Sequence, residues 1–331
     1  MARGLSVLED LGIVVIGRNE GERLKRSIAS FPEGVPVVYV DSGSTDGSPE
    51  WVREQGGSVV ELDTSKPFSA ARARNEGTDR LLAEHPGTHF IQFVDGDCEL
   101  MDGWIEAGLV RLKEDETLAV VAGQRLERFP DASWYNALCH IEWNTPVGEA
   151  AAVGGDAIYR LEAFRKVGGF DPMMMAGEEP ELCLRLRREG YRVERLDHPM
   201  TLHDAAIHTF DAWWKRAVRS GYAYTLGALK HGRQGYNVRE VIRSLLWGAG
   251  LPVLAVVLLI GGLWWLGLAV LALYPLKWIR MRRAVAYRTD KPGKYAYYLM
   301  LTNVAEVRGI IRALIETVKQ ERSILEYKSA S

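Results

Sequence analysis

The chain has 331 residues, of which 47% are hydrophobic and 25% are charged, and its formal net charge is -2. This length allows one large domain with a substantial core and a further segment. No basic run with interleaved aromatic residues is present, which excludes an obvious nucleic-acid-binding surface and predicts no nucleic acid partner. Cys98, Cys139 and Cys183 are odd in number and lack zinc-ligand spacing, so a reducing compartment is expected.

Strands and helices alternate in the N-terminal part of the chain. An apolar run at residues 12–17 is followed by a helical pattern that reaches residue 30. A second run at residues 35–40 precedes a helical pattern that begins near residue 49, and a third at residues 58–62 precedes one over residues 69–83. A fourth apolar run covers residues 89–94. This alternation predicts an α/β fold with a doubly wound, mostly parallel sheet, in which ligands bind beyond the carboxyl ends of the strands.

A pair of carboxylates, Asp95 and Asp97, follows the fourth predicted strand. Side chains of a strand alternate between its faces, so these two would project the same way, and Gly96 between them lets a ligand approach the backbone. Hard oxygen ligands at this spacing suit Mg²⁺ or Mn²⁺, and such an ion suits a diphosphate. Asp-Gly-Asp is also ordinary turn chemistry, and that alternative stays open on this motif alone.

Two further acidic residues follow predicted strands, Glu20 after the first and Asp41 after the second. Because the carboxyl ends of parallel strands meet at one edge, these side chains are expected to converge with Asp95 and Asp97. The dinucleotide-binding alternative requires Gly-x-Gly-x-x-Gly after the first strand, and residues 17–21 do not supply it. No phosphate-binding loop of the Gly-Lys-Ser/Thr type is present either.

Five segments in this order give the chain a resemblance to the family 2 glycosyltransferases, which have the A-type, Rossmann-like glycosyltransferase fold. The resemblance extends from about residue 12 to residue 227, and its segments are residues 16–20, 40–48, 71–77, 95–97 and 177–186. It implies transfer of a sugar from a nucleoside-diphosphate sugar donor, with Mn²⁺ or Mg²⁺ as the cofactor.

The resemblance also implies roles on the donor side. Asp41 resembles the carboxylate that accepts a hydrogen bond from the nucleobase, and Glu20 would line the same pocket. Asp95 resembles the partner of the ribose or of the metal, and Asp97 the direct metal ligand. Arg74, and with it Arg72, would face the base or the diphosphate. The two arginines cannot point the same way on one helix, so a solvated helix face remains the alternative.

Other segments resemble the catalytic and acceptor sides of the family site. Glu178 and Glu179 match the acidic catalytic motif, whose usual second residue is Asp, so the general base Glu179 would reach one methylene further. Acidic residues that merely favour a helix N-terminus are the alternative. His203 resembles a histidine that completes the metal site with Asp97 and Asp95. Finally, Gly155 and Asp156 lie where the family places its acceptor-binding loop, although a turn would explain them equally well.

The C-terminal part of the chain predicts a membrane segment. No residue between Arg243 and Lys277 is charged, and one helix of that length would be about 50 Å long, well beyond a hydrocarbon core of about 30 Å. A two-helix hairpin that turns near residues 261–262 is therefore predicted. A single tilted helix and a buried helix of a soluble protein are the alternatives. Basic residues flank both ends of the segment, which predicts cytoplasmic flanks at the cell membrane.

These observations predict three parts: a nucleotide-sugar-binding catalytic domain over residues 1–235, a transmembrane segment over residues 236–283, and a basic amphipathic cytoplasmic tail over residues 284–331. Helical spacing in the tail predicts an apolar stripe that lies on the bilayer or packs against the catalytic domain. The stripe consists of Val304, Val307, Ile311, Leu314, Ile315 and Val318.

The expected function is a metal-dependent, inverting transfer of a sugar to a hydroxyl group of a membrane-associated acceptor, by an enzyme whose catalytic domain is cytoplasmic. The acceptor would be a lipid-linked glycan or a polyprenyl lipid, because an enzyme held at the bilayer meets such molecules there. Inversion comes from the resemblance and not from the residues. A nucleotidyltransferase on a related fold and a catalytically silent membrane scaffold are the alternatives.

Overall fold

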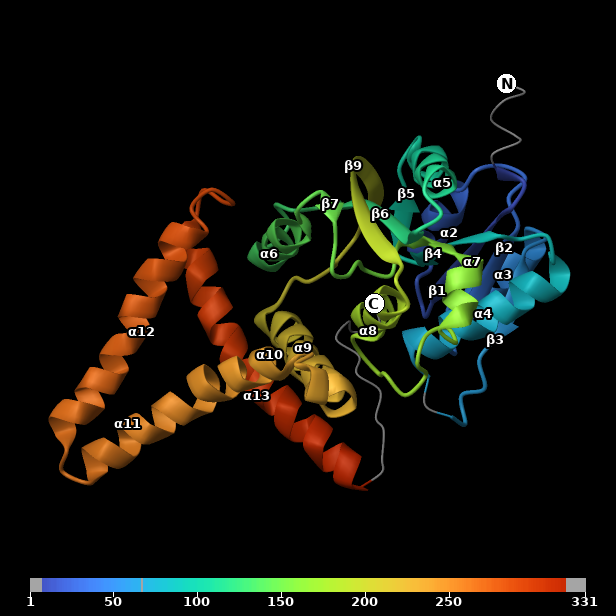
Figure 1. Cartoon of the computed structure of the whole chain (residues 1–331). Helices are drawn as coiled ribbons and strands as arrows, with labels where there is room; N and C mark the ends of the chain where they lie inside the picture. Colours follow the sequence, from blue (N-terminus) through green and yellow to red (C-terminus); the bar gives the residue numbers. More distant parts are fainter. Residues whose placement is uncertain (1–7, 67, 320–331) are drawn as a thin grey trace. The chain divides into compact units, whose positions relative to one another are not determined.

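The computed structural model describes residues 8–66 and 68–319, which form two compact units (Figure 1). The first unit ends at Ala206 and the second begins at Ile207. The predicted division into three domains is not tested by this result and stays a prediction. The predicted tail beyond residue 319 lies outside the described residues.

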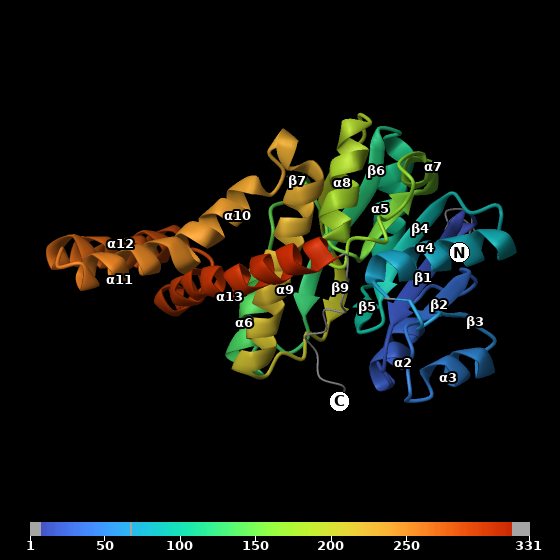
Figure 2. The ribbon, with the colours of Figure 1, turned by 90° about the horizontal axis from the view of Figure 1, so that it is seen from below.

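The first unit is built on a nine-stranded sheet in the order β3-β2-β1-β4-β8-β6-β9-β5, with β7 paired to β9. Figures 1 and 2 show β1, β2 and β3 side by side. The strands are β1 (Leu11–Gly17), β2 (Val37–Asp41), β3 (Ser58–Glu61), β4 (Phe90–Asp95), β5 (Cys98–Leu100), β6 (Leu118–Glu127), β7 (Gly148–Glu149), β8 (Ala157–Arg160) and β9 (Arg192–His203).

The predicted α/β fold is confirmed, and its sheet is mixed. The strands β3, β2, β1 and β4 are parallel, as the alternation of strands and helices predicts. Beyond β4, strand β8 runs antiparallel to both β4 and β6, β9 runs parallel to β6, and β5 and β7 run antiparallel to β9. The parallel half therefore brings the ends of β1, β2 and β4 to one edge of the sheet.

Helices pack on this sheet through small residues as well as large apolar ones. On α4, a Cβ atom added to Gly77 would lie 2.5 Å from Val14 and 2.6 Å from Val40, so this glycine allows the helix to approach β1 and β2. The core of the unit is otherwise aliphatic and aromatic. The helices are α2 (Glu22–Ala29), α3 (Ser48–Glu54), α4 (Ala70–Glu84), α5 (Trp104–Glu114), α6 (Trp134–Trp143), α7 (Leu161–Lys166) and α8 (Glu178–Arg188).

The second unit is helical in its described part. It contains α9 (Phe210–His231), the 3₁₀ turn η1 (Gly232–Gln234), α10 (Val238–Leu245), the π-helical turn η2 (Leu246–Gly250), α11 (Leu251–Ile260), α12 (Trp264–Ala284) and α13 (Pro292–Lys319). Between α11 and α12 the chain turns at Gly261 and Gly262, and Gly262 has a φ of 80°, a conformation that favours glycine.

By length and composition, one helix among the described residues could cross a membrane, Val238–Ile260. It is formed by α10, η2 and α11 without a break. Only 11% of its most apolar window is buried, so most of its apolar surface faces outward. This exposure supports membrane association; the predicted crossing and the cytoplasmic location of the first unit stay predictions.

Candidate active site

Acidic residues gather where the parallel strands end. Gly17 at the end of β1 pairs with Asp41 of β2, and Ile16 pairs with Asp95 of β4, so the three strands finish at the same level. Glu20 follows β1 and lies close to the loop after β4, because a Cβ atom added to Gly96 would come within 3.2 Å of the Glu20 Cγ atom. The structure thus brings Glu20 beside the Asp95–Asp97 loop, at the edge where a ligand is expected.

Asp41 is 2% exposed and organises the loop that follows β2. Its Oδ2 atom accepts hydrogen bonds from the backbone N–H groups of Gly43 and Ser44, both at 2.8 Å, and its Oδ1 atom accepts one from the Tyr39 hydroxyl at 2.9 Å. Burial, followed by the charge of Asp41, raises the pKa of Tyr39, so this hydroxyl stays protonated as a donor. These contacts fix the carboxylate rigidly, and its role toward a nucleobase stays a prediction.

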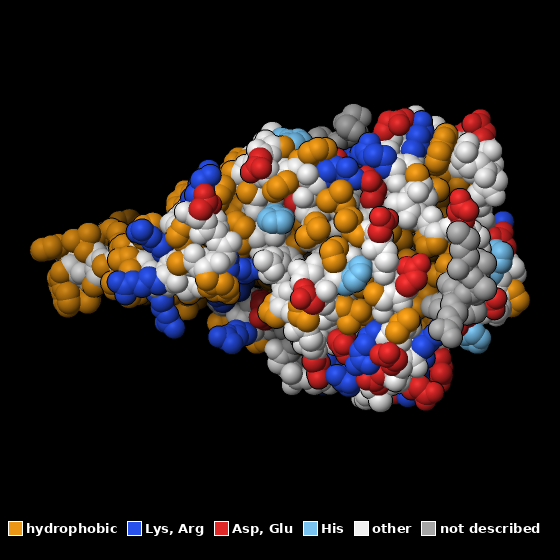
Figure 3. Space-filling model, turned by 90° about the horizontal axis from the view of Figure 1, so that it is seen from above, with side chains coloured by type: hydrophobic (Ala, Val, Ile, Leu, Met, Phe, Trp, Pro, Cys, Tyr) orange, Lys and Arg blue, Asp and Glu red, His pale blue; other side chains and the backbone are white. Residues whose placement is uncertain are grey.

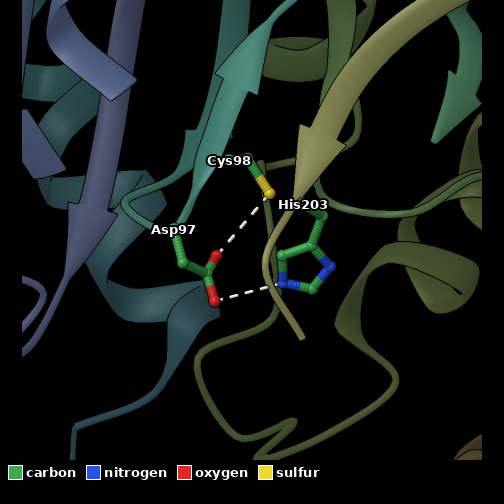
Figure 4. A group of neighbouring side chains, drawn as sticks. All are labelled: Asp97, Cys98 and His203. Atoms are coloured by element: carbon green, nitrogen blue, oxygen red, sulfur yellow. Dashed lines mark hydrogen bonds and ion pairs between the residues drawn. The ribbon is translucent and has the colours of Figure 1, made fainter. Parts of the chain in front are cut away.

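Asp97 and His203 meet although they are far apart in sequence (Figure 4). Cys98 on β5 pairs directly with His203 on β9, and this pairing places the imidazole Nε2 atom 3.1 Å from the Asp97 Oδ2 atom. The Cys98 Sγ atom lies 3.6 Å from the other Asp97 oxygen. The structure therefore brings together the two residues predicted as a carboxylate and an imidazole ligand, through the β5/β9 ladder.

The electrostatic surroundings keep His203 neutral. Burial, and next the positive charge of Arg125, lower the pKa of His203 to about 4. The contact with Asp97 is therefore a hydrogen bond from a neutral imidazole near pH 7, and not an ion pair. A neutral imidazole is the form that binds a metal ion.

These side chains fit a divalent ion. Atoms of Asp97, Cys98 and His203 that can coordinate a metal lie within 4.8 Å of one another. The His203 Nδ1 atom is buried and has no hydrogen-bond partner in the part of the chain that the structure describes. A carboxylate with an imidazole suits Mn²⁺. Asp95, the third predicted metal ligand, is not in this group and lies instead with Cys98 and Asp156.

Arg74 is the centre of a second cluster. It is 1% exposed, and its guanidinium contacts Asp95 at 2.9 Å and both Glu178 and Glu179 at 3.2 Å. It also lies over the ring of Phe170, with 5.4 Å between its Cζ atom and the ring centroid. The structure therefore brings Arg74 together with the predicted site residues Asp95, Glu178 and Glu179, and its predicted role toward the base or the diphosphate stays a prediction.

The Arg74 cluster has a local origin in helices α4 and α8. Ser69 caps α4 by accepting a hydrogen bond from the Arg72 backbone N–H, and Arg74 then lies on the buried side of the helix with Ala71 and Thr78. Glu178 and Glu179 form the first turn of α8, after Gly177 in the left-handed conformation. The side chain of Glu178 is 3% exposed and that of Glu179 is 18% exposed, so Glu179 is the more accessible of the pair.

Arg72 does not join this cluster. Its guanidinium donates to Glu76 at 2.6 Å and to the carbonyl oxygen of Asp63 at 2.9 Å. The two arginines are separated around α4, as the helical spacing requires. A role for Arg72 toward the donor stays a prediction that these contacts do not support.

Asp95 connects the Arg74 cluster to a further cation, Arg125. Burial alone would raise the pKa of Asp95, but the charges of Arg74 and Arg125 outweigh it and lower the pKa to about 2. Arg125, on β6, lies 3.9 Å from Asp95 and 2.6 Å from Asp156. Asp95 is consequently ionised and held between two guanidinium groups.

The predicted acceptor-binding residues Gly155 and Asp156 contact Arg74 and Asp95 in the interior of the unit. Asp156 is fully buried; it accepts hydrogen bonds from the Asp95 backbone N–H at 3.1 Å and from the Thr201 hydroxyl at 3.2 Å. Gly155 is required to be small, because a Cβ atom there would lie 2.1 Å from an Arg74 nitrogen. In this structure both residues position other side chains, and contact with an acceptor stays a prediction.

Two residues were not predicted from the sequence. The Arg125 guanidinium lies 5.5 Å from the ring centroid of Trp143, and Trp143 packs on His203 with 4.6 Å between ring centroids. Arg125 leaves one signal in the sequence, a charged residue soon after the apolar start of strand β6. Trp143 leaves none, because an aromatic residue on α6 is ordinary core composition.

The assembled groups have complementary chemistry. Asp97 and His203 have the chemistry of metal ligands, Arg74 and Arg125 carry fixed positive charge, and Glu179 is a partly accessible carboxylate. Fixed positive charge stabilises a leaving group that becomes negative, and a nearby carboxylate can accept a proton. This combination fits group transfer from a phosphorylated donor to a hydroxyl group.

Comparison with protein families agrees with this chemistry. Residues 12–168 match the model described as "Glycosyl transferase family 2", and residues 116–281 match "Glycosyl transferase family group 2". The second match covers half of the chain, and the two together include every predicted site residue. The resemblance inferred from the five sequence segments is confirmed.

Among curated proteins, the chain is similar to the pre-mycofactocin glycosyltransferase of Mycobacterium tuberculosis, with 29% identity over 67% of this chain and 48% of that protein. It is also similar to the succinoglycan biosynthesis protein ExoA of Rhizobium meliloti, with 27% identity over 59% of this chain and 61% of that protein. The chain therefore spans about half to three fifths of the length of these relatives.

Among solved structures, the chain resembles a mannosyltransferase from Pyrobaculum calidifontis in complex with GDP-Man and Mn²⁺. The TM-score is 0.57 at 17% identity, and the match covers 92% of this chain and 87% of that one. At this identity the likeness concerns the fold alone.

Proposed function

Because this chain belongs to the family 2 glycosyl transferases, we propose that it moves a sugar from a nucleoside-diphosphate sugar to a hydroxyl group of a membrane-associated acceptor. The observation that carries the proposal is the convergence of Asp97 and His203, with Arg74 holding the adjacent carboxylates, at the carboxyl ends of the strands. This edge of an open α/β sheet is where ligands bind.

The donor would lie across the ends of β1, β2 and β4. Glu20 and Asp41 would face the nucleoside, since they follow the first two strands. Asp97 and His203 would hold Mn²⁺ or Mg²⁺, with Asp95 beside them. A bound ion would neutralise the diphosphate and so make it a better leaving group.

Glu179 is the proposed general base. Its side chain is the more exposed one of the Glu178–Glu179 pair, and its contact with Arg74 keeps it oriented. Glu179 would take the proton of the acceptor hydroxyl while the hydroxyl oxygen bonds to the anomeric carbon. The bond between that carbon and the diphosphate breaks in the same step, which inverts the configuration. Arg74 would act through Glu179 and Asp95 as a positioning residue.

The acceptor proposed is a lipid-linked glycan or a polyprenyl lipid at the cytoplasmic face of the cell membrane. Support comes from the outward-facing apolar helix Val238–Ile260 and from the basic residues that flank the apolar segment. A related protein of Rhizobium meliloti is named for succinoglycan biosynthesis, which agrees with a role in glycan assembly.

Donor binding can be tested by thermal unfolding of the detergent-purified full chain. Wild type, Asp97→Ala and Asp102→Ala would be compared with UDP, GDP, CDP and dTDP, each with Mn²⁺ or with EDTA. Ligands that bind the native state raise its melting temperature. We expect one nucleotide to do so with Mn²⁺ only, in wild type and in Asp102→Ala, whose substituted residue is exposed outside the site.

In Asp97→Ala the shift should disappear, and transferase activity with the matching sugar donor should fall by about 10²-fold or more. A shift that persists in this variant or in EDTA would contradict the proposed metal site. If no nucleotide stabilises the folded wild-type chain, the proposed donor site is wrong.

A further inference from the structure

Helix α13 buries small, apolar and a few polar residues on one side and exposes large apolar residues on the other. The buried residues of its second half include the small residues Ala305, Gly309 and Ala313, which recur every four positions along one side. The carboxylate residues Glu306 and Glu316 and the amide Asn303 are buried on the same side. A helix on the surface of a water-soluble protein turns a polar face to the solvent, whereas the exposed side of α13 is largely apolar.

The small residues allow very close packing within the second unit. A Cβ atom added to Gly309 would lie 2.0 Å from the carbonyl oxygen of Val218 on α9. A Cβ atom added to Gly221 on α9 would likewise lie 2.1 Å from the carbonyl oxygen of Glu306. Backbone contact between helices through small residues is typical of packing in a lipid environment, where apolar burial gives no advantage.

The inward carboxylates are paired. Glu306 accepts hydrogen bonds from Arg243 at 3.1 Å and from the Ser244 hydroxyl. Glu316 accepts one from the Tyr222 hydroxyl at 2.8 Å and another from Arg312 at 2.8 Å. The two buried carboxylates of α13 therefore have partners inside the unit.

The outward side of α13 carries the apolar stripe predicted from the sequence. Ile311 is 50% exposed and Val318 is 83% exposed. The other strongly exposed apolar residues on this side of the helix are Tyr297, Val304, Leu314 and Ile315. Within the described residues of the second unit, exposed apolar side chains also cover α11 and α12, as Figure 3 shows for the hairpin.

Basic residues border this apolar surface. Arg308 and Lys319 are exposed on α13, about a sixth of a turn or more from the centre of the stripe. The end of α12 and the start of α13 add a second basic group, exposed at Arg280, Arg282, Arg283, Lys291 and Lys294. Such an arrangement complements anionic headgroups above an apolar layer.

We propose that the outward side of α13 lies in the surface of an anionic bilayer, with its apolar stripe in the acyl region and its basic residues at the headgroups. This is a second membrane contact, separate from the hairpin and independent of sugar transfer. The occupant is lipid because the carboxylates Glu306 and Glu316 of α13 are buried, the exposed apolar surface continues in the same unit, and the border is basic. If the stripe faced water and not lipid, it would tend to associate with another protein surface.

The proposal can be tested by spin labelling of the full chain in nanodiscs of phosphatidylcholine and phosphatidylglycerol. Single cysteines would replace Ile311 on the stripe, Arg308 at its border, and Glu114, an exposed residue of α5. The native cysteines are buried and do not compete for the label. Collisions with oxygen, which concentrates in lipid, would be compared with collisions with a water-soluble nickel chelate.

We expect the oxygen-to-nickel ratio to be severalfold higher at Ile311→Cys than at Arg308→Cys, and lowest at Glu114→Cys. With phosphatidylcholine alone the ratio at Ile311→Cys should fall, because the headgroup attraction is lost. A ratio at Ile311→Cys equal to that at Glu114→Cys would overturn the proposal. Protection from both reagents would also overturn it, because another protein surface would then cover the stripe. Nucleotide binding, measured on the same samples, reports separately on the proposed function.

Discussion

The two units of the chain handle charge and apolar surface in opposite ways. In the first unit, apolar residues fill the interior, and Asp41 and Asp95 lie at the ends of β2 and β4. In the second unit, Glu306 and Glu316 are buried while Ile311 and Val318 face outward. The kinds of residue that are buried and exposed thus differ between the two units of one chain.

The proposed bilayer contact of the second unit accounts for this difference. A fold that excludes water buries its apolar residues and leaves charges at the surface or at a site. Helices in lipid gain nothing from burying apolar side chains, so small residues and paired polar groups determine their contacts. Buried charge lies largely at the proposed ligand site in the first unit, and between packed helices in the second.

The largest expected effect comes from removing the cation at the centre of the first unit's site. Arg74→Met leaves Asp95, Glu178 and Glu179 without their shared partner in a buried setting. We expect a loss of about 3–5 kcal/mol in the free energy of unfolding, measured by urea titration in detergent. Arg72→Met on the same helix removes a more exposed pair and should cost under about 1 kcal/mol. Equal losses in both variants would show that the buried Arg74 cluster contributes no more to stability than the more exposed pair of Arg72.

A smaller effect should follow a change of pH in the metal-free protein. The pKa of His203 is about 4 when folded and near 6.5 when unfolded, so the unfolded chain binds the proton more tightly. Stability should therefore be complete above about pH 6.5 and decline as the pH falls toward 4, by about 2 kcal/mol between pH 7 and pH 5.

The folded pKa of Asp95 is also lowered, but its contribution is lost only between about pH 4 and 2, so the two residues act in separate windows. Comparing His203→Gln with wild type isolates the histidine. If the dependence between pH 7 and 5 is as steep in the variant, another group is responsible.

The smallest effects should distinguish the two sides of α13. Gly309→Ala places a methyl group against the α9 backbone and should lower stability in detergent by about 1–3 kcal/mol. Ile311→Gln changes the outward side and should alter stability by less than about 0.5 kcal/mol, because it removes no contact inside the unit. Thermal unfolding of both variants in the same detergent measures the contrast. A larger loss in Ile311→Gln would mean that the stripe packs against protein.

The sequence predicts the parallel half of the sheet and the acidic residues at its edge. Alternating apolar runs and helices locate β1, β2 and β4, and Asp41 and Asp95 end two of those strands as expected. It also identifies His203, but only by resemblance, because the pairing of Cys98 with His203 depends on the mixed half of the sheet. No local pattern reports which distant strand lies beside β5.

The sequence does not predict which way the side chains face. Helical spacing separates Arg72 from Arg74 but does not tell which one is buried. Likewise, the spacing of Val304, Ile311 and Val318 predicts a stripe, while the direction that the stripe faces depends on packing at Gly309 and Ala313. Arg125 and Trp143 were missed because their contacts are formed entirely by tertiary structure.

The pairing of β5 with the last residues of β9 also constrains how the protein is made. Asp97 and His203 are 106 positions apart, and β9 must form before they can meet. A nascent chain emerges from the ribosome in order, so the carboxylate is available long before its imidazole partner. We expect the site to gain its affinity for a metal ion only after residue 203 has emerged, as the apolar helices that follow begin to be synthesised.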